Sequence, residues 1–486
     1  MGEIEMNLSM IGYIVGCVIE IEAVLMLLPA LVGLLYGEQS GVCFLICAGI
    51  AAAVGLFAIH KKPKNTSFYA REGIVATALS WLMMSAIGAA PFAITGQIPH
   101  YLDALFEMVS GFTTTGASIL PQVEALDKCM LFWRSFSHWI GGMGVLVFML
   151  AILPLAGGNN LYLMRAESPG PTVDKLSPKL RSSAAWLYGI YLGLSLLCFI
   201  LLKIGGMTVF DAACLTFGAA GTGGFGVVSS SFADYSMFCK VTVTVFMLLF
   251  GLNFNFYYLL LFRKIKDALK MEEIRWYLFA FFFASGTILL NLYHAGILGN
   301  GAGAIDAFFS VSSVMTTTGY ATVDFNLWPT YSKIILVTIM FTGACAGSTG
   351  GGIKISRFVI YFKAVSKELR RLAHPRSVRH LRLNGKTVDD DVVQNTFVYL
   401  VVFVLIYGVS VLIVALDGLD TTTTFTAVAA TINNIGPGLG AVGPAGNFAG
   451  FSWLSKIVLI FDMLAGRLEI FPLVIFFLPA TWKKQA

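Results

Sequence analysis

The sequence FTTTGA at residues 112–117 recurs almost unchanged as MTTTGY at residues 315–320. Each copy follows a short semi-apolar stretch that begins with Asp-Ala, at Asp103 and at Asp306. Threonine and glycine are an unusual choice in a chain that is otherwise dominated by apolar residues. Their repetition at matched positions indicates that the chain is built from repeated units.

Two further stretches share this layout. DAACLTFGAAGTGGFG at residues 211–226 also begins with Asp-Ala, and TTFTAVAATINNIGPG at residues 423–438 begins with Thr423. A glycine lies 13 positions after each of the four starts, at Gly116, Gly224, Gly319 and Gly436. The chain therefore contains four related units, each with a short semi-apolar segment and then a stretch rich in Thr, Asn and Gly.

The composition argues against a soluble globular protein. The chain has 486 residues, of which 57% are hydrophobic and only 12% are charged, and its mean hydropathy is +0.80. Apolar runs of about 18 residues or more are typical of transmembrane helices. We read ten such segments: 10–35, 41–59, 74–95, 130–155, 183–205, 236–262, 274–294, 331–361, 393–416 and 454–480. The prediction is an all-α polytopic membrane protein.

The basic residues indicate the orientation in the membrane, because cytoplasmic loops carry an excess of Lys and Arg. Most of the 32 lysines and arginines lie in the loops 61–73, 156–183, 263–275 and 354–391 and in the C-terminal tail. We therefore expect these loops and both termini in the cytoplasm. The net charge of +5 is then a signal of topology, and we expect no nucleic-acid partner.

The four semi-apolar segments are too short to cross a bilayer and suit re-entrant half-helices. Backbone without helical hydrogen bonds is tolerated at membrane depth only where it is buried in protein or lines water. Four such loops around one axis meet this condition. The partly negative C-terminal ends of the half-helices then favour a cation at the centre, and loop carbonyls can replace its hydration shell. A single copy is better explained as a polar extracellular turn, but four matched copies favour a pseudo-fourfold pore.

Several motifs resemble the Trk/Ktr/HKT superfamily of potassium transporters, and specifically its TrkH-type subunits. They are SGFTTTGAS (110–118), WIGGMGV (139–145), MRAESPGP (164–171), GACAGSTGGGIK (343–354), ATINNIGPGLG (430–440) and GRLEIFP (466–472). The resemblance implies four helix–pore loop–helix repeats and two additional N-terminal transmembrane helices. It also implies potassium uptake across the bacterial cytoplasmic (inner) membrane, with K⁺ as the transported ion and no covalent cofactor. A homodimer and a TrkA-type cytosolic regulatory protein, which binds the nucleotide, are the implied partners, besides membrane lipid.

The resemblance divides the chain into an N-terminal helix pair and four pore repeats. The expected boundaries are 1–73 for the helix pair and 74–155, 156–262, 263–386 and 387–486 for the repeats.

The resemblance implies a selectivity filter that is made of four short segments, one in each repeat. We call these segments the filter loops. They comprise Thr113, Thr114, Thr115 and Gly116; Gly221, Thr222, Gly223 and Gly224; Thr316, Thr317, Thr318 and Gly319; and Asn433, Asn434, Ile435 and Gly436. The second loop leaves open whether Gly223 or Gly224 is the filter glycine, although the spacing and the following Phe225, opposite Tyr320, favour Gly224. Such uneven loops predict a looser preference for potassium over sodium than in potassium channels.

Glycines also recur in the helix that follows each filter loop, where they mark kinks or close helix packing. The third unit is extreme, since TGACAGSTGGG at residues 342–352 has no ordinary helical composition. We predict an unwound glycine-rich loop at residues 342–352 that gates the path below the filter; close packing of small residues is the alternative. The expected gate residues are Gly343, Gly347, Ser348, Thr349, Gly350, Gly351, Gly352, Lys354 and Arg467.

Arg467 is the arginine deep inside the last apolar segment, where a cation is a functional candidate by default. We expect it to raise a barrier to cations or to anchor the glycine-rich loop through backbone carbonyls. An ion pair with Asp462 or Glu469 is the structural alternative.

The basic loop 354–391 has two interpretations that the sequence does not separate, attraction to anionic lipid or docking of the regulatory protein.

Other function classes remain as alternatives. A sodium-coupled Ktr-type potassium transporter is the nearest, although the N-terminal helix pair favours the TrkH type. A secondary transporter for another cation would require inverted repeats, whereas these repeats share one orientation. No HExxH or GxSxG motif supports a membrane-embedded enzyme, so we expect no enzymatic activity. Coupling to protons or sodium, as in symport, stays open.

Overall fold

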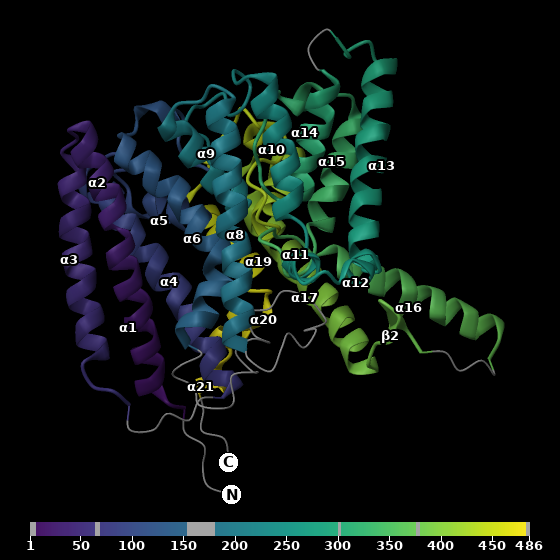
Figure 1. Cartoon of the computed structure of the whole chain (residues 1–486), viewed down its shortest axis with the longest axis horizontal. Helices are drawn as coiled ribbons and strands as arrows, with labels where there is room; N and C mark the ends of the chain where they lie inside the picture. Colours follow the sequence, from purple (N-terminus) through teal and green to yellow (C-terminus); the bar gives the residue numbers. More distant parts are fainter. Residues whose placement is uncertain (1–5, 64–68, 153–179, 300–302, 376–379, 483–486) are drawn as a thin grey trace, which may run out of the picture.

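A computed structural model describes residues 6–63, 69–152, 180–299, 303–375 and 380–482 (Figure 1). Helices dominate these residues. Three helices come first in the chain: α1 (Leu8–Leu25), α2 (Leu27–Tyr36) and α3 (Ser40–Ile59). Helix α1 packs against α3 and α4, and Glu22 of α1 is buried there. This group lies at one side of the bundle in Figure 1.

Four units follow, each with a spanning helix, a short pore helix, a filter loop and a returning helix. The first two contain α4 (Ala70–Ile94), α5 (Tyr101–Phe112), α6 (Lys128–Ile152), α8 (Leu180–Ile204), α9 (Val209–Gly221), α10 (Met237–Phe250), α11 (Phe254–Leu261) and α12 (Ile265–Leu269). The last two contain α13 (Glu272–His294), α14 (Ala304–Met315), α15 (Thr330–Thr342), α16 (Ile355–Ala373), α17 (Asp390–Val414), α18 (Thr421–Ile432), α19 (Trp453–Arg467), α20 (Phe471–Phe477) and α21 (Pro479–Trp482).

Short 3-10 turns and one β-hairpin complete the described structure. The turns are η1 (Val123–Ala125), η2 (Phe325–Leu327), η3 (Ala415–Asp417) and η4 (Gly440–Val442). The hairpin pairs β1 (Arg382–Leu383) with β2 (Lys386–Thr387) in antiparallel register across an Asn-Gly turn. Its two turn residues, Asn384 and Gly385, have φ of 52° and 78°, as a tight hairpin turn requires.

The units contact one another in a closed cycle. The returning helix of each unit touches the pore helix of the next, through α6 with α9, α10 with α14, α15 with α18, and α19 with α5. The last of these contacts joins the fourth unit to the first. The predicted all-α polytopic fold with four pore repeats is therefore confirmed.

Among the described residues, α1 and α2 together form one span over predicted segment 10–35, whereas three other predicted apolar segments bend, unwind or break. Segment 236–262 bends by 89° between α10 and α11, segment 331–361 unwinds between α15 and α16, and segment 454–480 breaks between α19 and α20. The breaks begin at or beside Gly251, Gly343 and Gly466, where the sequence predicts weak points. Glycine lowers helix stability, and at the Gly251 break other backbone groups bond to the open turn: the Cys345 N–H donates to the Gly251 carbonyl and the Phe254 N–H donates to the Gly347 carbonyl, both at 3.0 Å.

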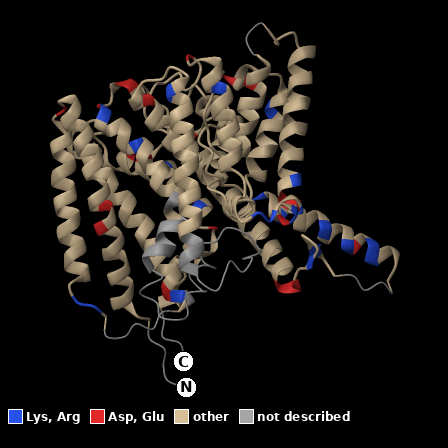
Figure 2. Cartoon of the chain, in the orientation of Figure 1, with Lys and Arg blue, Asp and Glu red and all other residues tan. Residues whose placement is uncertain are grey.

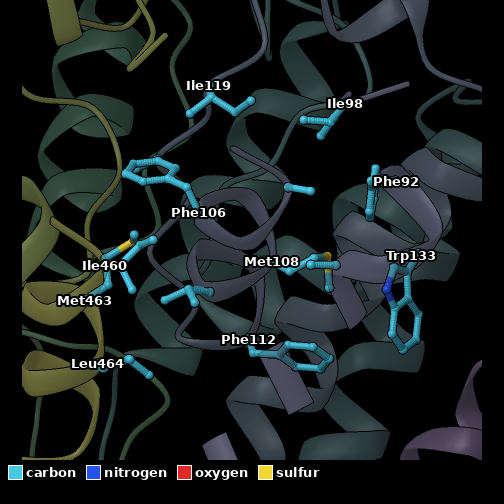
Figure 3. Close-up of a cluster of buried hydrophobic side chains, with 14 of the residues drawn as sticks. Phe92, Ile98, Phe106, Met108, Phe112, Ile119, Trp133, Ile460, Met463 and Leu464 are labelled. Carbon is cyan, nitrogen blue, oxygen red and sulfur yellow. The ribbon is translucent and has the colours of Figure 1, made fainter. Parts of the chain in front are cut away.

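The pore helices lie in the interior. Figure 3 shows Phe106, Met108 and Phe112 of α5 among Phe92, Trp133 and residues of α19, and each of these named side chains is buried. The Trp133 indole N–H donates to the Gly88 carbonyl at 3.1 Å, which ties α6 to α4. Because α5 contacts helices on both sides, the position of the first filter loop is set by tertiary packing.

The basic segment after the third filter loop projects from the bundle. Helix α16 points away from the core near the hairpin, and Figure 2 shows Lys and Arg along it. The MRAESPGP motif at 164–171, most of loop 156–183 and the boundary between repeats 1 and 2 lie outside the described residues. The domain boundaries therefore stay predictions.

Candidate functional site

All four pore helices end in the same hydrogen-bonded turn. The N–H groups of Thr115, Gly223, Thr318 and Ile435 each donate, at 2.8 Å, to the carbonyl five residues earlier in the chain. This bond is the hallmark of a helix end that is closed by a left-handed residue. The bond satisfies one carbonyl at each helix end. Because all four ends share it, each filter loop departs from its own pore helix in the same direction.

The backbone of the filter loops repeats residue by residue. Left-handed φ values occur at Thr114 (57°), Thr222 (54°), Thr317 (59°) and Asn434 (54°), and again two residues later at Gly116 (78°), Gly224 (80°), Gly319 (88°) and Gly436 (96°). A left-handed conformation costs a residue with a Cβ atom about 1–2 kcal/mol. Because three threonines and an asparagine nevertheless adopt it at the same position, the conformation of the loop requires it there. This register makes Gly224, not Gly223, the equivalent of the other three glycines.

The filter glycines also bring the loops into main-chain contact. A Cβ atom at Gly116 would overlap the carbonyl oxygen of Gly223, one at Gly224 that of Thr318, and one at Gly319 that of Ile435. A Cβ at Gly436 would lie 2.8 Å from the carbonyl oxygen of Thr115. Each loop thus abuts the next, and the fourth abuts the first, in one closed ring.

Most filter hydroxyl and amide groups brace the loops. The Thr113 hydroxyl donates to Val109 at 2.6 Å, and the Thr316 hydroxyl donates to Ser312 at 2.7 Å. The Asn433 amide occupies the equivalent position and donates to the Ala429 carbonyl at 2.8 Å. These three side chains therefore bond to their own pore helices, which leaves backbone carbonyls as the main candidate ligands.

Asn434 links the fourth loop to its neighbours. Its amide nitrogen donates to the Thr115 hydroxyl at 2.9 Å and to the Met463 carbonyl at 2.8 Å. The same side chain therefore joins the last loop, the first loop and α19. The second loop has no such side chain, because the Thr222 hydroxyl donates to its own neighbour, Gly221, at 2.6 Å.

A buried ion pair stands behind the first two loops. Arg134 of α6 and Glu107 of α5 lie 2.7 Å apart, with side chains only 1% and 0% exposed. Glu107 also accepts from the Ser118 hydroxyl and the Ile119 N–H, both at 2.9 Å. The Arg134 guanidinium lies 4.0 Å from the centre of the Phe225 ring. The pair thereby holds the chain segment that follows the first loop beside the segment that follows the second loop.

Histidine 138 connects the same two loops. The N–H of Phe225 donates to His138 Nε2 at 3.2 Å, so the ring carries its proton on Nδ1, which donates to the Gly111 carbonyl at 2.8 Å. Next to it, a Cβ atom at Gly221 would overlap the His138 carbonyl. A cavity of about 120 Å³ adjoins this region and is lined by all four filter glycines and by Arg134.

The glycine-rich loop, which connects α15 to α16, is unwound as predicted and contacts the third and fourth filter loops. Positive φ values occur at Gly343 (68°), Gly347 (68°), Gly352 (78°) and Lys354 (82°). The N–H of Gly351 donates to the Thr317 hydroxyl at 2.6 Å. Cβ atoms at Gly350 and Gly351 would press on the carbonyls of Thr316 and Asn433. Only residues without side chains allow this approach.

Two bonds within the glycine-rich loop and one to α10 hold the rest of the loop. The Lys354 ammonium donates to the Gly350 carbonyl, and the Ser348 hydroxyl donates to the Cys345 carbonyl at 2.6 Å. The Thr349 hydroxyl donates to the Phe250 carbonyl at 3.3 Å. The loop therefore has a defined conformation that several hydrogen bonds hold.

Arg467 joins the glycine-rich loop to the first unit. Its Nη1 donates to the Thr349 carbonyl at 2.8 Å, and its Nη2 donates to the Gly141 carbonyl at 2.6 Å. The alternative partners considered from the sequence have other bonds, since Glu469 pairs with Arg357 and Asp462 accepts from Ser410 at 2.7 Å. The predicted anchoring contact is thus present, and its effect on ion flow stays a prediction.

Sequence reasoning did not single out Glu107, Arg134, His138 or Glu273 as site residues. The available signal for Arg134 and His138 was their charge or polarity inside the apolar segment 130–155, which marks functional candidates in membrane proteins, and for Glu107 it was a charge inside a pore segment. Glu273 lies in the basic loop 263–275 and gave no such signal. All four are buried, and each bonds to a filter loop, to the strand after it or to the glycine-rich loop. Among the described residues, no group of three His, Cys, Asp or Glu side chains is arranged to hold a metal ion.

Comparison with known proteins identifies the family. The family model for TrkH, described as cation transport protein, matches residues 40–484. The Trk system potassium uptake protein TrkH of Escherichia coli K12 is 34% identical over 99% of this chain and 100% of its own length. The TrkH of Vibrio parahaemolyticus is 35% identical over 97% of this chain and 98% of its own length.

A solved structure agrees with these matches. The crystal structure of the potassium transporter TrkH from Vibrio parahaemolyticus superposes with a TM-score of 0.87, at 32% identity, and the match covers 98% of this chain and 100% of that one. The described helices, with several apolar spans, are those of a multi-pass membrane protein. The closed ring of four filter loops, the sequence matches and the superposition agree: this chain belongs to the TrkH family of cation transport proteins.

Proposed function

We propose that this chain takes up potassium ions across the bacterial cytoplasmic membrane through the ring of four filter loops. One observation carries the proposal, the repetition of the same backbone conformation in four loops that close on one another. Such a ring offers carbonyl oxygens from four sides, which is the arrangement that replaces the hydration shell of a potassium ion. The relatives from Escherichia coli and Vibrio parahaemolyticus are named as potassium uptake proteins.

The ion path runs between the loops and past the glycine-rich loop. The carbonyls of Thr115, Gly223, Thr318 and Ile435, which lie against neighbouring loops, are the proposed potassium ligands together with those of the adjoining filter residues. The glycine-rich loop, held against the filter by Thr317 and by Arg467, blocks the path in this conformation. Conduction requires the loop to move, so the loop is the proposed gate.

Control of the gate comes from the cytosol. The basic helix α16 leaves the glycine-rich loop directly and projects from the bundle, where a TrkA-type nucleotide-binding protein can dock. Names of relatives such as Trk system proteins TrkH and TrkG refer to a system of several components. We propose a homodimer, cytoplasmic termini and a nucleotide that is bound by the partner and not by this chain.

The test is ion flux into liposomes that contain the purified protein. The wild type is expected to carry potassium and rubidium in preference to sodium, with the TrkA-type partner and its nucleotide added where needed. Gly319→Ser places a side chain against the Ile435 carbonyl at a φ of 88° and is expected to reduce that preference while flux persists. Gly408→Ser is the matched control, because nothing lies within 4 Å of a Cβ there. A wild type that carries none of these ions would overturn the proposal.

A further inference from the structure

The first turn of α13 carries two adjacent carboxylates that face different parts of the molecule. Glu273 reaches the glycine-rich loop: its Oε1 accepts from the Ala346 N–H at 2.6 Å, and its Oε2 accepts from the Asn253 amide at 3.3 Å. Glu273 is only 5% exposed. A buried carboxylate needs such partners, and a charge-assisted bond to a backbone N–H is among the stronger ones.

Glu272 reaches the cytosolic hairpin instead. Its backbone N–H donates to Asn384 Oδ1 at 2.7 Å, and its Oε1 accepts from the Asn384 N–H at 3.0 Å. Its Oε2 pairs with the ammonium of Lys363 on α16, which also donates to the Arg382 carbonyl at 2.7 Å. The turn of the β1–β2 hairpin, α16 and α13 are therefore joined at one residue.

The part of the glycine-rich loop that Glu273 holds is also bonded to the break between α10 and α11. The Cys345 N–H donates to the Gly251 carbonyl at 3.0 Å, and the Phe254 N–H donates to the Gly347 carbonyl at 3.0 Å. Asn253, whose amide donates to Glu273, lies inside this break. Glu273 is thus the side chain shared by the loop, the broken helix and α13.

We propose that the first turn of α13 couples the β1–β2 hairpin to the glycine-rich loop, with Glu273 as the positioning residue that holds residues 345–347 in the blocking place. A cytosolic protein that shifts the hairpin or α16 then displaces Glu272, which is bonded to both. Because Glu273 is the next residue in the chain, it moves with Glu272 and displaces the loop. The inference rests on the proposed gating role of the loop. An acidic residue also stabilises the start of any helix, so the test needs a readout that helix stability alone does not move.

The experiment measures rubidium flux, and its potassium/sodium preference, in liposomes without the regulatory partner. Glu273→Ala removes the hydrogen bond from Ala346 of the loop and the bond from Asn253 beside it, and it is expected to raise flux about tenfold at unchanged ion preference. Glu273→Gln keeps an acceptor for the Ala346 N–H and is expected to fall between the wild type and Glu273→Ala. Glu368→Ala is the matched control, because Glu368 is a half-exposed carboxylate of α16 that pairs only with Arg371 among its described partners.

Asn384→Gly tests the coupling from the hairpin side. Glycine keeps the left-handed φ of 52° and removes only the acceptor for the Glu272 N–H. A rise in flux of about threefold is expected, and the double variant with Glu273→Ala should conduct like Glu273→Ala alone, because both act on one path. Should Glu273→Ala fail to fold, as judged by size-exclusion chromatography, Glu273→Gln and Asn384→Gly decide the question.

The outcomes separate this inference from the proposed function. If the wild type conducts with potassium preference but folded Glu273 and Asn384 variants conduct like it, the coupling is wrong and the transporter stands. Multiplicative effects in the double variant, or a flux change that alters ion preference, also overturn the coupling. If the wild type conducts none of the ions under any condition, the proposed function fails, and the coupling fails with it.

Discussion

Replacing Arg467 by alanine offers a direct test of how the glycine-rich loop is held. The side chain makes one hydrogen bond to the loop, at Thr349, and one to α6, at Gly141. Alanine removes both, but only the bond to Thr349 crosses from α19 to the loop. The closed arrangement should therefore lose one charge-assisted hydrogen bond while the filter loops keep their contacts.

The size of the effect follows from that bond. A hydrogen bond to a charged group contributes about 1.5–3 kcal/mol, and because Arg467 is only partly buried we use the lower end. A shift of about 1.4 kcal/mol is a tenfold change in an equilibrium, so potassium or rubidium flux should rise roughly tenfold. The assay is flux into liposomes at equal amounts of folded protein, without a regulatory partner.

Arg467→Lys separates two explanations of such a rise. Lysine keeps the positive charge but, with a single ammonium, cannot reproduce the fork that reaches two carbonyls. If the loss of the anchor dominates, lysine should conduct nearly as fast as alanine; if the charge acts mainly as a barrier to cations, lysine should resemble the wild type. Folded Arg467→Ala protein with wild-type flux would refute both explanations.

Three further predictions concern the filter and its surroundings. Glu107→Gln leaves Arg134 buried without its anion and should lower the free energy of unfolding by about 3–5 kcal/mol, read as a lower midpoint of thermal unfolding in detergent. Asn434→Ala removes two hydrogen bonds and should cost about 2 kcal/mol and weaken the preference for potassium over sodium in flux assays. Hydrogen bonds from Thr423 lower the pKa of Asp420 at the start of α18, so its stabilising effect should be full above the usual carboxyl pKa near 4 and vanish as the pH falls through the lowered value. Asp420→Asn should accordingly lower the thermal midpoint at pH 7 but have little effect near pH 2.

A more exposed ion pair of the same helix, α5, provides the control for Glu107→Gln. Asp103 pairs with Lys456 at 2.6 Å, but the two side chains are 20% and 10% exposed, so Asp103→Asn should destabilise clearly less than Glu107→Gln. Equal losses for both substitutions would contradict the role given to burial. An Asn434→Ala protein with unchanged ion preference would show that the fourth loop tolerates loss of its brace. A pH-independent effect of Asp420→Asn would rule out the charge as its cause.

The repeat could be predicted from the sequence because its signals are local. A semi-apolar segment of fixed length, an acidic or threonine start and a glycine at fixed spacing determine where each pore helix begins and where its chain leaves the helix. The same spacing favours Gly224 over Gly223 as the glycine equivalent to those of the other loops, and the φ of 80° at Gly224 matches theirs. Glycine content likewise marked the unwinding of residues 343–354, since a helix of that composition is unstable on its own.

Contacts between units could not be predicted in this way. Nothing near Asn434 in the sequence indicates that its amide bonds to Thr115, which belongs to the first unit. Likewise, Arg467 belongs to the fourth unit and bonds to Gly141 of the first. Asp462 and Glu469, which are near Arg467 in the sequence, bond to Ser410 and Arg357 instead. Such pairings depend on how the units close into a ring, which only the packing of the whole chain decides.

The bond between the first and last loops also has a consequence for biosynthesis. The ribosome releases the first filter loop more than three hundred residues before Asn434, so the first loop lacks its partner in the fourth unit during much of translation. A chain that stops before α18 would lack the fourth loop, so the first and third loops would have no neighbour on one side inside the bilayer, where unsatisfied polar groups are costly. Truncated products should consequently be recognised by membrane quality control, and the last unit acts as the checkpoint of assembly.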